Sequence, residues 1–160
     1  MHFAIVTQEI TSTNREDVGV AEGEAMTGDT EREQMQRKHV FAVNGDTAFL
    51  DLIRELLQDE RYNVTTTNYV PKTFDLIACL QPSLLIVDLV IGEVAGWKLL
   101  DRLQAEAITQ GIPVIATSTM QRLLDRASAD QARYGSNQYL VKPFDLDDLI
   151  DTTRRLIGPA

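Results

Sequence analysis

The stretch Leu84-Leu85-Ile86-Val87-Asp88 decides the fold of this 160-residue chain. Four large apolar residues in a row are typical of a strand that is buried on both faces of a parallel sheet. The run ends in a carboxylate, and functional residues of open parallel sheets gather at the carboxyl ends of the strands. The stretch therefore predicts a central strand with Asp88 at the functional edge of its sheet.

Strand-like and helix-like segments alternate on both sides of this stretch. Further strands are expected at residues 40–43, 63–66, 112–116 and 139–141. Between and after them, apolar residues recur at the three- and four-residue spacing of one helix face. The expected helices cover residues 49–57, 71–80, 96–107, 120–134 and 146–157, the last of them capped by Asp145. This order predicts an α/β fold, a (βα)5 three-layer sandwich whose doubly wound parallel five-stranded sheet is covered by helices on both faces.

Composition separates the chain into two parts. Residues 1–38 hold eight acidic residues against four basic ones and show no sustained apolar periodicity. Such a segment buries too little apolar surface to offset the entropy cost of ordering it, so a mobile acidic tail is expected. Residues 39–158 carry the regular pattern and are expected to form one domain.

Charge and cysteine content disfavour several kinds of function. The formal net charge of −9 disfavours direct binding to nucleic acid, because an acidic surface repels phosphates. Cys79 is the single cysteine, and with His2 and His39 as the two histidines no zinc site is expected. No apolar stretch approaches the roughly 20 residues that span a bilayer, so a cytoplasmic protein without a membrane partner is predicted.

Polar residues collect at the predicted carboxyl ends of the strands. They are Asn44, Gly45, Asp46, Asp88, Thr117, Ser118 and Lys142. Because these strand ends meet at one edge of the sheet, the residues are expected to share one site. The loop after the first strand is too short to cradle a phosphate ester, and no P-loop or dinucleotide fingerprint occurs. A flavodoxin-like binder of flavin or nucleotide is therefore disfavoured.

Four features in this order resemble the response regulator receiver family of two-component signalling. They are residues 84–88 with Gly96 eight residues on, residues 112–118, Gly135 with Tyr139, and Lys142-Pro143-Phe144. The resemblance covers residues 39 to about 157. It implies a flavodoxin-like, CheY-like fold and a phosphorelay function without enzymatic activity on a separate substrate.

The resemblance also implies roles for single residues. Asp88 would accept a phosphoryl group from the phosphohistidine of a histidine kinase or phosphotransfer protein, and Lys142, before a cis Pro143, would pair with the phosphoryl oxygens. Ser118, five residues after the proline of the fourth strand, takes the hydroxyl position, with Thr117 as the competing candidate. Tyr139 falls at the switch aromatic, whose movement would expose a surface for a downstream protein partner or for a homodimer through the last helix.

The loop after the first strand departs from the family pattern. Receivers usually place an acidic pair there to bind a divalent cation, but here the pair falls on Asn44 and Gly45. Magnesium, the cofactor that the resemblance implies, prefers hard oxygen ligands. The remaining candidate ligands are Asp46, Asn44, Asp88 and the backbone carbonyl of Val90.

Three outcomes are open for this loop. Asp46 turns into the site and restores one carboxylate, or the metal site is weak and phosphorylation is slow. In the third outcome the domain is a pseudo-receiver, a protein-interaction module that signals by contacts without phosphate.

Overall fold

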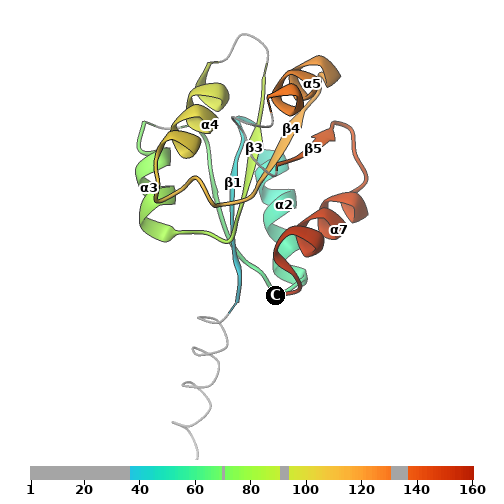
Figure 1. Ribbon diagram of the computed structural model, residues 1–160. Coiled ribbons are helices and arrows are strands. Elements are labelled where there is room, and N and C mark those ends of the chain that lie inside the picture. The colour runs from blue at the N-terminus through green and yellow to red at the C-terminus, as the bar shows by residue number, and fades with distance from the viewer. Residues whose placement is uncertain (1–36, 70, 91–93, 131–136) are drawn as a thin grey trace, which may run out of the picture.

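The five strands form a single parallel sheet in the computed structural model, which describes residues 37–69, 71–90, 94–130 and 137–160 (Figure 1). The strand order is β2-β1-β3-β4-β5, and every neighbouring pair is parallel. The strands are β1 His39–Val43, β2 Asn63–Thr67, β3 Leu84–Asp88, β4 Val114–Ser118 and β5 Gln138–Val141. The chain runs outward from β1 to β2 and then back to β3, so the topological switch point lies between β1 and β3.

Burial along the strands follows their apolar content. All residues of β3 and β4 are buried, whereas every residue of the edge strands β2 and β5 is only partly buried. The threonines of β2 suit an edge position, because their hydroxyls can be solvated there while their branched side chains favour the strand. The prediction that residues 84–88 form the central strand is confirmed.

Helices cover both faces of the sheet, as predicted (Figure 1). They are α2 Thr47–Asp59, α3 Thr73–Leu80, α4 Ala95–Ala105, α5 Gln121–Ala129 and α7 Leu146–Ile157. One buried cluster takes Phe74 from α3, Leu100 from α4 and Leu124 from α5. The cluster on the other face takes Ile53 from α2 and Leu149 from α7. The three-layer α/β sandwich predicted from the alternation of segments is therefore present.

Several boundaries differ from the predicted ones for local reasons. The fourth strand begins at Val114, because Pro113 has no N–H to give to the ladder, although its carbonyl accepts from Leu85 N at 3.0 Å. Helix α4 ends at Ala105, where Thr109 Oγ1 donates to Leu103 O at 2.8 Å and replaces the next helical bond. Asp145 caps α7 as predicted, since its side chain accepts from Asp147 N.

Other predicted segments fall partly outside the described residues. The tail predicted for residues 1–38 does so except for Arg37 and Lys38, which lead into β1. The predicted end of the helix over 120–134, with Gly135, also lies outside. Among the residues that the structure describes, no helix has the length and apolar character needed to cross a membrane.

The central strand supplies a test of the packing. Leu85 is fully buried in β3, so Leu85→Ala should lower the free energy of unfolding by about 2–5 kcal/mol, from lost transfer energy and the cavity left behind. Leu52, on the outer side of α2 and 43% exposed, is the matched control. Leu52→Ala should change the free energy of unfolding by less than about 0.5 kcal/mol. Urea unfolding followed by far-UV circular dichroism measures both. Equal losses in the two variants would contradict the central placement of β3.

Candidate functional site

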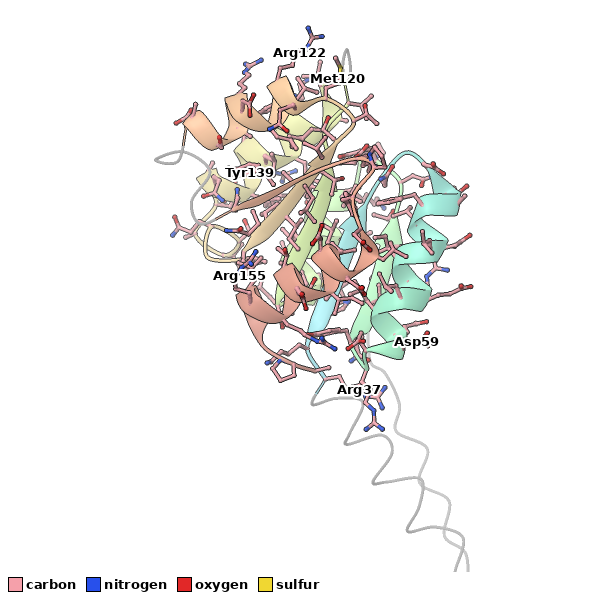
Figure 2. The ribbon with its side chains drawn as sticks, turned by 90° about the vertical axis from the view of Figure 1, so that its right-hand side faces the viewer. Arg37, Asp59, Met120, Arg122, Tyr139 and Arg155 are labelled. Atoms are coloured by element: carbon pink, nitrogen blue, oxygen red, sulfur yellow. The ribbon has the colours of Figure 1, made fainter. Side chains whose placement is uncertain are left out.

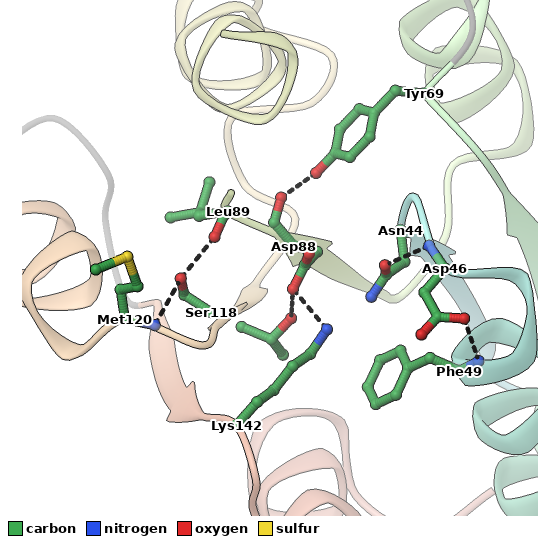
Figure 3. Close-up of polar contacts among 10 residues, drawn as sticks. Asn44, Asp46, Phe49, Tyr69, Asp88, Leu89, Ser118, Met120 and Lys142 are labelled. Carbon is green, nitrogen blue, oxygen red and sulfur yellow. Dashed lines mark hydrogen bonds and ion pairs between the residues drawn. The ribbon is translucent and has the colours of Figure 1, made fainter. Parts of the chain in front are cut away.

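Asp88 lies at the carboxyl end of β3 and is 6% exposed. One of its carboxylate oxygens, Oδ1, lies 2.7 Å from Lys142 Nζ and accepts a hydrogen bond of 2.8 Å from Thr117 Oγ1 (Figure 3). No hydrogen bond reaches the second oxygen, Oδ2, from the residues that the structure describes. The arrangement therefore holds the carboxylate by one oxygen and leaves the other without a hydrogen bond from the described residues.

Lys142 reaches Asp88 from the segment that follows β5. Its backbone N–H donates to Ser118 O at 2.7 Å, which holds the start of this segment beside β4. The Lys142–Pro143 peptide bond is cis, as the resemblance implied. The ammonium lies 4.0 Å from the centroid of the Phe49 ring, and that ring in turn makes an edge contact with Phe144. The ammonium is thus held between a carboxylate and an aromatic face.

Tyr69 and Gly96 both lie against the backbone carbonyl of Asp88. The hydroxyl of Tyr69 donates a short hydrogen bond to this oxygen (Figure 3). A Cβ atom at Gly96, in the first turn of α4, would lie 2.7 Å from the same oxygen and 3.0 Å from the Tyr69 hydroxyl. Gly96 therefore allows α4 to approach the end of β3, and this close approach is the physical reason for glycine at that position.

Thr117, not Ser118, supplies the hydroxyl that touches Asp88. Asp88 and Thr117 are register partners on adjacent parallel strands, so their side chains lie on the same face of the sheet. Ser118 points elsewhere: its hydroxyl donates to Leu89 O at 2.6 Å and accepts from Met120 N at 3.2 Å (Figure 3). In this structure the competing candidate makes the contact, and the role predicted for Ser118 stays a prediction.

Tyr139 is partly buried on β5, with α5 on one side and α7 on the other (Figure 2). Its ring packs against the cluster shared by α3, α4 and α5. Its hydroxyl is buried and has no hydrogen-bond partner among the described residues, and burial raises its pKa above the ordinary value. The ring therefore lies inward here, while the predicted switching movement stays a prediction.

The loop after β1 ties one carboxylate oxygen of Asp46 to the start of α2. Asp46 is the N-cap of α2, and its Oδ1 accepts from Ala48 N at 3.0 Å and Phe49 N at 3.2 Å. This position satisfies backbone donors at the helix start and places the negative charge at the positive end of the helix dipole. One oxygen of Asp46 is therefore engaged by α2, and the outcome in which Asp46 restores a site carboxylate stays a prediction.

Asn44 turns its amide oxygen toward the backbone of Asp46 and its amide nitrogen toward the Asp88–Lys142 pair (Figure 3). It is 2% exposed, and its Oδ1 accepts from Asp46 N at 2.9 Å. Its other amide atom, Nδ2, is buried and has no partner among the described residues. A nitrogen that carries two protons is a donor and repels a metal ion.

These residues do not fit a magnesium ion. Magnesium requires several oxygen ligands in near-octahedral geometry. Gly45 supplies no side chain, and Val90, whose carbonyl was the remaining candidate, borders the undescribed residues 91–93. No group of three or more His, Cys, Asp or Glu side chains suited to a metal occurs in the described part of the chain. Asn44 and Gly45 thus supply no carboxylate at the positions where the family's acidic pair falls.

A doubly wound parallel sheet with a buried strand-end aspartate, a lysine after the last strand and a hydroxyl between them is the architecture of receiver modules. The family model described as "Response regulator receiver domain" matches residues 40–154, which is more than half of the chain. The chain therefore belongs to the response regulator receiver family of two-component signalling.

Curated relatives agree with this assignment. The chain is 28% identical over 118 residues to the DNA-binding dual master transcriptional regulator RpaA of Synechocystis, covering 74% of this chain and 48% of that protein. It is 32% identical over 111 residues to an uncharacterized 14.6 kDa protein of Leptolyngbya boryana, covering 69% of this chain and 83% of that one. The cell cycle response regulator CtrA of Brucella ovis is 26% identical, with 46% of its length covered. The chain thus spans about half the length of RpaA and CtrA.

Solved structures share the fold. Chemotaxis protein CheY4 of Vibrio cholerae superposes with a TM-score of 0.65 at 19% identity, covering 75% of this chain and 98% of that one. The receiver domain of sensor histidine kinase PA1611 of Pseudomonas aeruginosa gives 0.62 at 20% identity, covering 76% and 98%. That structure has a magnesium ion coordinated in its active site cleft.

Two residues at the site were not anticipated from the sequence. Tyr69 follows β2, so the strand-end rule would have pointed to it if it had been applied to that weaker strand. Phe49 was assigned to the apolar face of a helix, and its contact with Lys142 carries no local signal, because it depends on where two distant segments meet.

The close approach at Gly96 supplies a test. Gly96→Ala should lower the free energy of unfolding by about 1–3 kcal/mol, because the added Cβ meets a backbone oxygen that cannot move without displacing the end of β3. Gly111→Ala is the matched control, since no atom lies within 4 Å of a Cβ there, and it should change stability by less than about 1 kcal/mol. Chemical denaturation of both variants measures the difference. Wild-type stability in Gly96→Ala would show that α4 does not press on Asp88.

Proposed function

We propose that this domain accepts a phosphoryl group on Asp88 from the phosphohistidine of a histidine kinase or phosphotransfer protein. The observation that carries the proposal is the buried Asp88 carboxylate, with Oδ1 bound to Lys142 Nζ and Thr117 Oγ1 and Oδ2 left without a partner among the described residues. Oδ2 supplies the lone pair that attacks phosphorus, and the histidine nitrogen leaves with the electron pair of the broken P–N bond.

Lys142 then binds both the Asp88 carboxylate before the transfer and the phosphoryl oxygens after it. The transfer converts the carboxylate into a neutral acyl linkage and brings phosphoryl oxygens to the same place. The ammonium is a compact charge on a flexible stem, so it can follow the negative charge from Oδ1 to these oxygens. Its cation–π contact with Phe49 keeps it in the cleft during this change.

Output is proposed to pass to a downstream protein partner, or to a second copy of the chain through α7, by a conformational change and not by enzymatic activity on a separate substrate. The site connects to β5 through Lys142, and the buried hydroxyl of Tyr139 on that strand lacks a stabilising partner among the described residues. The acidic balance of the chain, with a net charge of −9, favours a protein surface over direct contact with nucleic acid or membrane. The proposed location is the cytoplasm.

One observation favours a second function, a pseudo-receiver that signals by protein contacts without phosphate. Asn44 presents a donor and Gly45 no side chain where a cation would bind, and Asp46 is held at the start of α2. A phosphoryl transfer that required magnesium would be slow in such a site. In this alternative the Lys142–Asp88 pair is a structural tie between β3 and the segment after β5.

The two functions are separated by one measurement. The full chain, incubated with acetyl phosphate, should gain the mass of one phosphoryl group, and Asp88→Asn should abolish the gain because the amide is not a nucleophile. Asp59→Asn, at the exposed end of α2, is the matched control and should be modified like the wild type. Intact-protein mass spectrometry at several times gives the rates. No adduct on the wild type, with or without magnesium, would leave the pseudo-receiver as the function.

A further inference from the structure

A buried hydrogen-bond donor without a partner lies beside the phosphoacceptor. Asn44 is 2% exposed, and its Nδ2 bonds to no described residue. Such groups are few in native proteins, because leaving a buried donor unpaired costs about 1–3 kcal/mol. Figure 3 shows this nitrogen on the side of the Asp88–Lys142 pair, with the amide oxygen turned toward Asp46.

The orientation of this amide is determined by its neighbours. Oδ1 accepts the backbone N–H of Asp46 at 2.9 Å. A flipped amide would place an NH2 group against that N–H, so two donors would face each other and the hydrogen bond would be lost. Asp46 is itself anchored, because its side chain caps α2. The sequence Asn44-Gly45-Asp46 thus forms a loop that directs a hydrogen-bond donor into the cleft.

We propose that Asn44 Nδ2 donates a hydrogen bond to a phosphoryl oxygen on Asp88, and that this site accepts the phosphoryl group without a metal ion. The inference rests on the proposed phosphoacceptor function. Lys142 supplies the positive charge, and Thr117 supplies a hydroxyl that is already at the carboxylate. Together with Asn44 they form a donor set of the kind that binds an anion and not a cation.

Charge balance makes a metal-free site reasonable. The acidic pair expected after β1 would carry two negative charges, and a divalent cation would cancel both. Asn44 and Gly45 carry none, so removing the pair and removing the cation leave the same net charge around a phosphorylated Asp88. A bound cation would also contact one phosphoryl oxygen directly. Without the cation another group must make this contact, and the unpaired Nδ2 of Asn44 is placed to do so.

The step with acetyl phosphate balances without an added reactant. A lone pair on Asp88 Oδ2 forms the new bond to phosphorus, and the bond between phosphorus and the acetate oxygen breaks. Acetate leaves with that electron pair, and Lys142 keeps its proton throughout. The neutral amide and the ammonium stabilise negative charge on the phosphoryl oxygens as it passes from donor to product.

The test compares rates of adduct formation in EDTA and in magnesium. The wild type should react at rates within about twofold in the two solutions. Asn44→Ala, which removes the donor, should react roughly tenfold to a hundredfold more slowly in both. Asn44→Asp with Gly45→Asp, for which there is open space around Gly45, should become magnesium-dependent by tenfold or more. The Asp59→Asn control should behave as the wild type does.

Metal dependence is a property that a purely structural role for Asn44 would not change. Thermal unfolding of each variant shows whether it is folded, and if Asn44→Ala is not, the doubly substituted variant and the wild-type EDTA rate still decide the question. A wild-type adduct that forms only with magnesium would overturn this inference and leave Asp88 as phosphoacceptor. An EDTA rate unchanged by Asn44→Ala would overturn the role of Asn44. No adduct in any solution would overturn both this inference and the proposed function.

Discussion

The ion pair between Lys142 and Asp88 joins the end of the central strand to the segment after the edge strand, across the end of β4 that lies between them. Thr117 of β4 donates to the same carboxylate oxygen, so β3, β4 and the segment after β5 meet at one atom. Removing one member of a fully buried pair costs about 3–5 kcal/mol, and this pair, with the Lys142 side chain 17% exposed, should lose less than that. A change in the charge of Asp88 would therefore alter the contacts that join β3 to β4 and to the segment after β5.

The other side of the cleft, formed by the loop after β1, is held by hydrogen bonds to backbone groups and not by an ion pair among the described residues. Asn44 and Asp46 are joined to each other and to the first turn of α2 by hydrogen bonds that use Asn44 Oδ1 and Asp46 Oδ1. The same loop that would hold a cation in a receiver with an acidic pair here satisfies backbone groups and offers an amide donor. Receiver architecture and metal chemistry are separable in this chain, because the sheet topology does not depend on the residues in the loop after β1.

Much of the fold was predictable because each strand and helix carries a local signal. Residues 84–88 are apolar without interruption and form the central strand, and the periodicity around Ile53 and Leu149 correctly indicated helices on the sheet. Boundaries were less predictable where one side chain decides them, as Thr109 does at the end of α4. At the site, the residues Asp88, Lys142 and Asn44 were all identified by their place at strand ends. The spacing rule that favoured Ser118 could not show which hydroxyl faces Asp88, because that depends on the register of β4 against β3.

The sequence by itself determined the alternation of strands and helices, the identity of the aspartate and lysine, and the loss of the acidic pair, because each is written in residue types and their order. Only the tertiary structure decided that Thr117 reaches Asp88, that Phe49 lies under the ammonium of Lys142, and that Asp46 faces a helix and Asn44 presents nitrogen to the cleft. Each of these depends on the direction of a side chain relative to a segment distant in the chain or on a choice between competing hydrogen bonds. Such directions are set by strand register and packing, which local residue patterns do not specify.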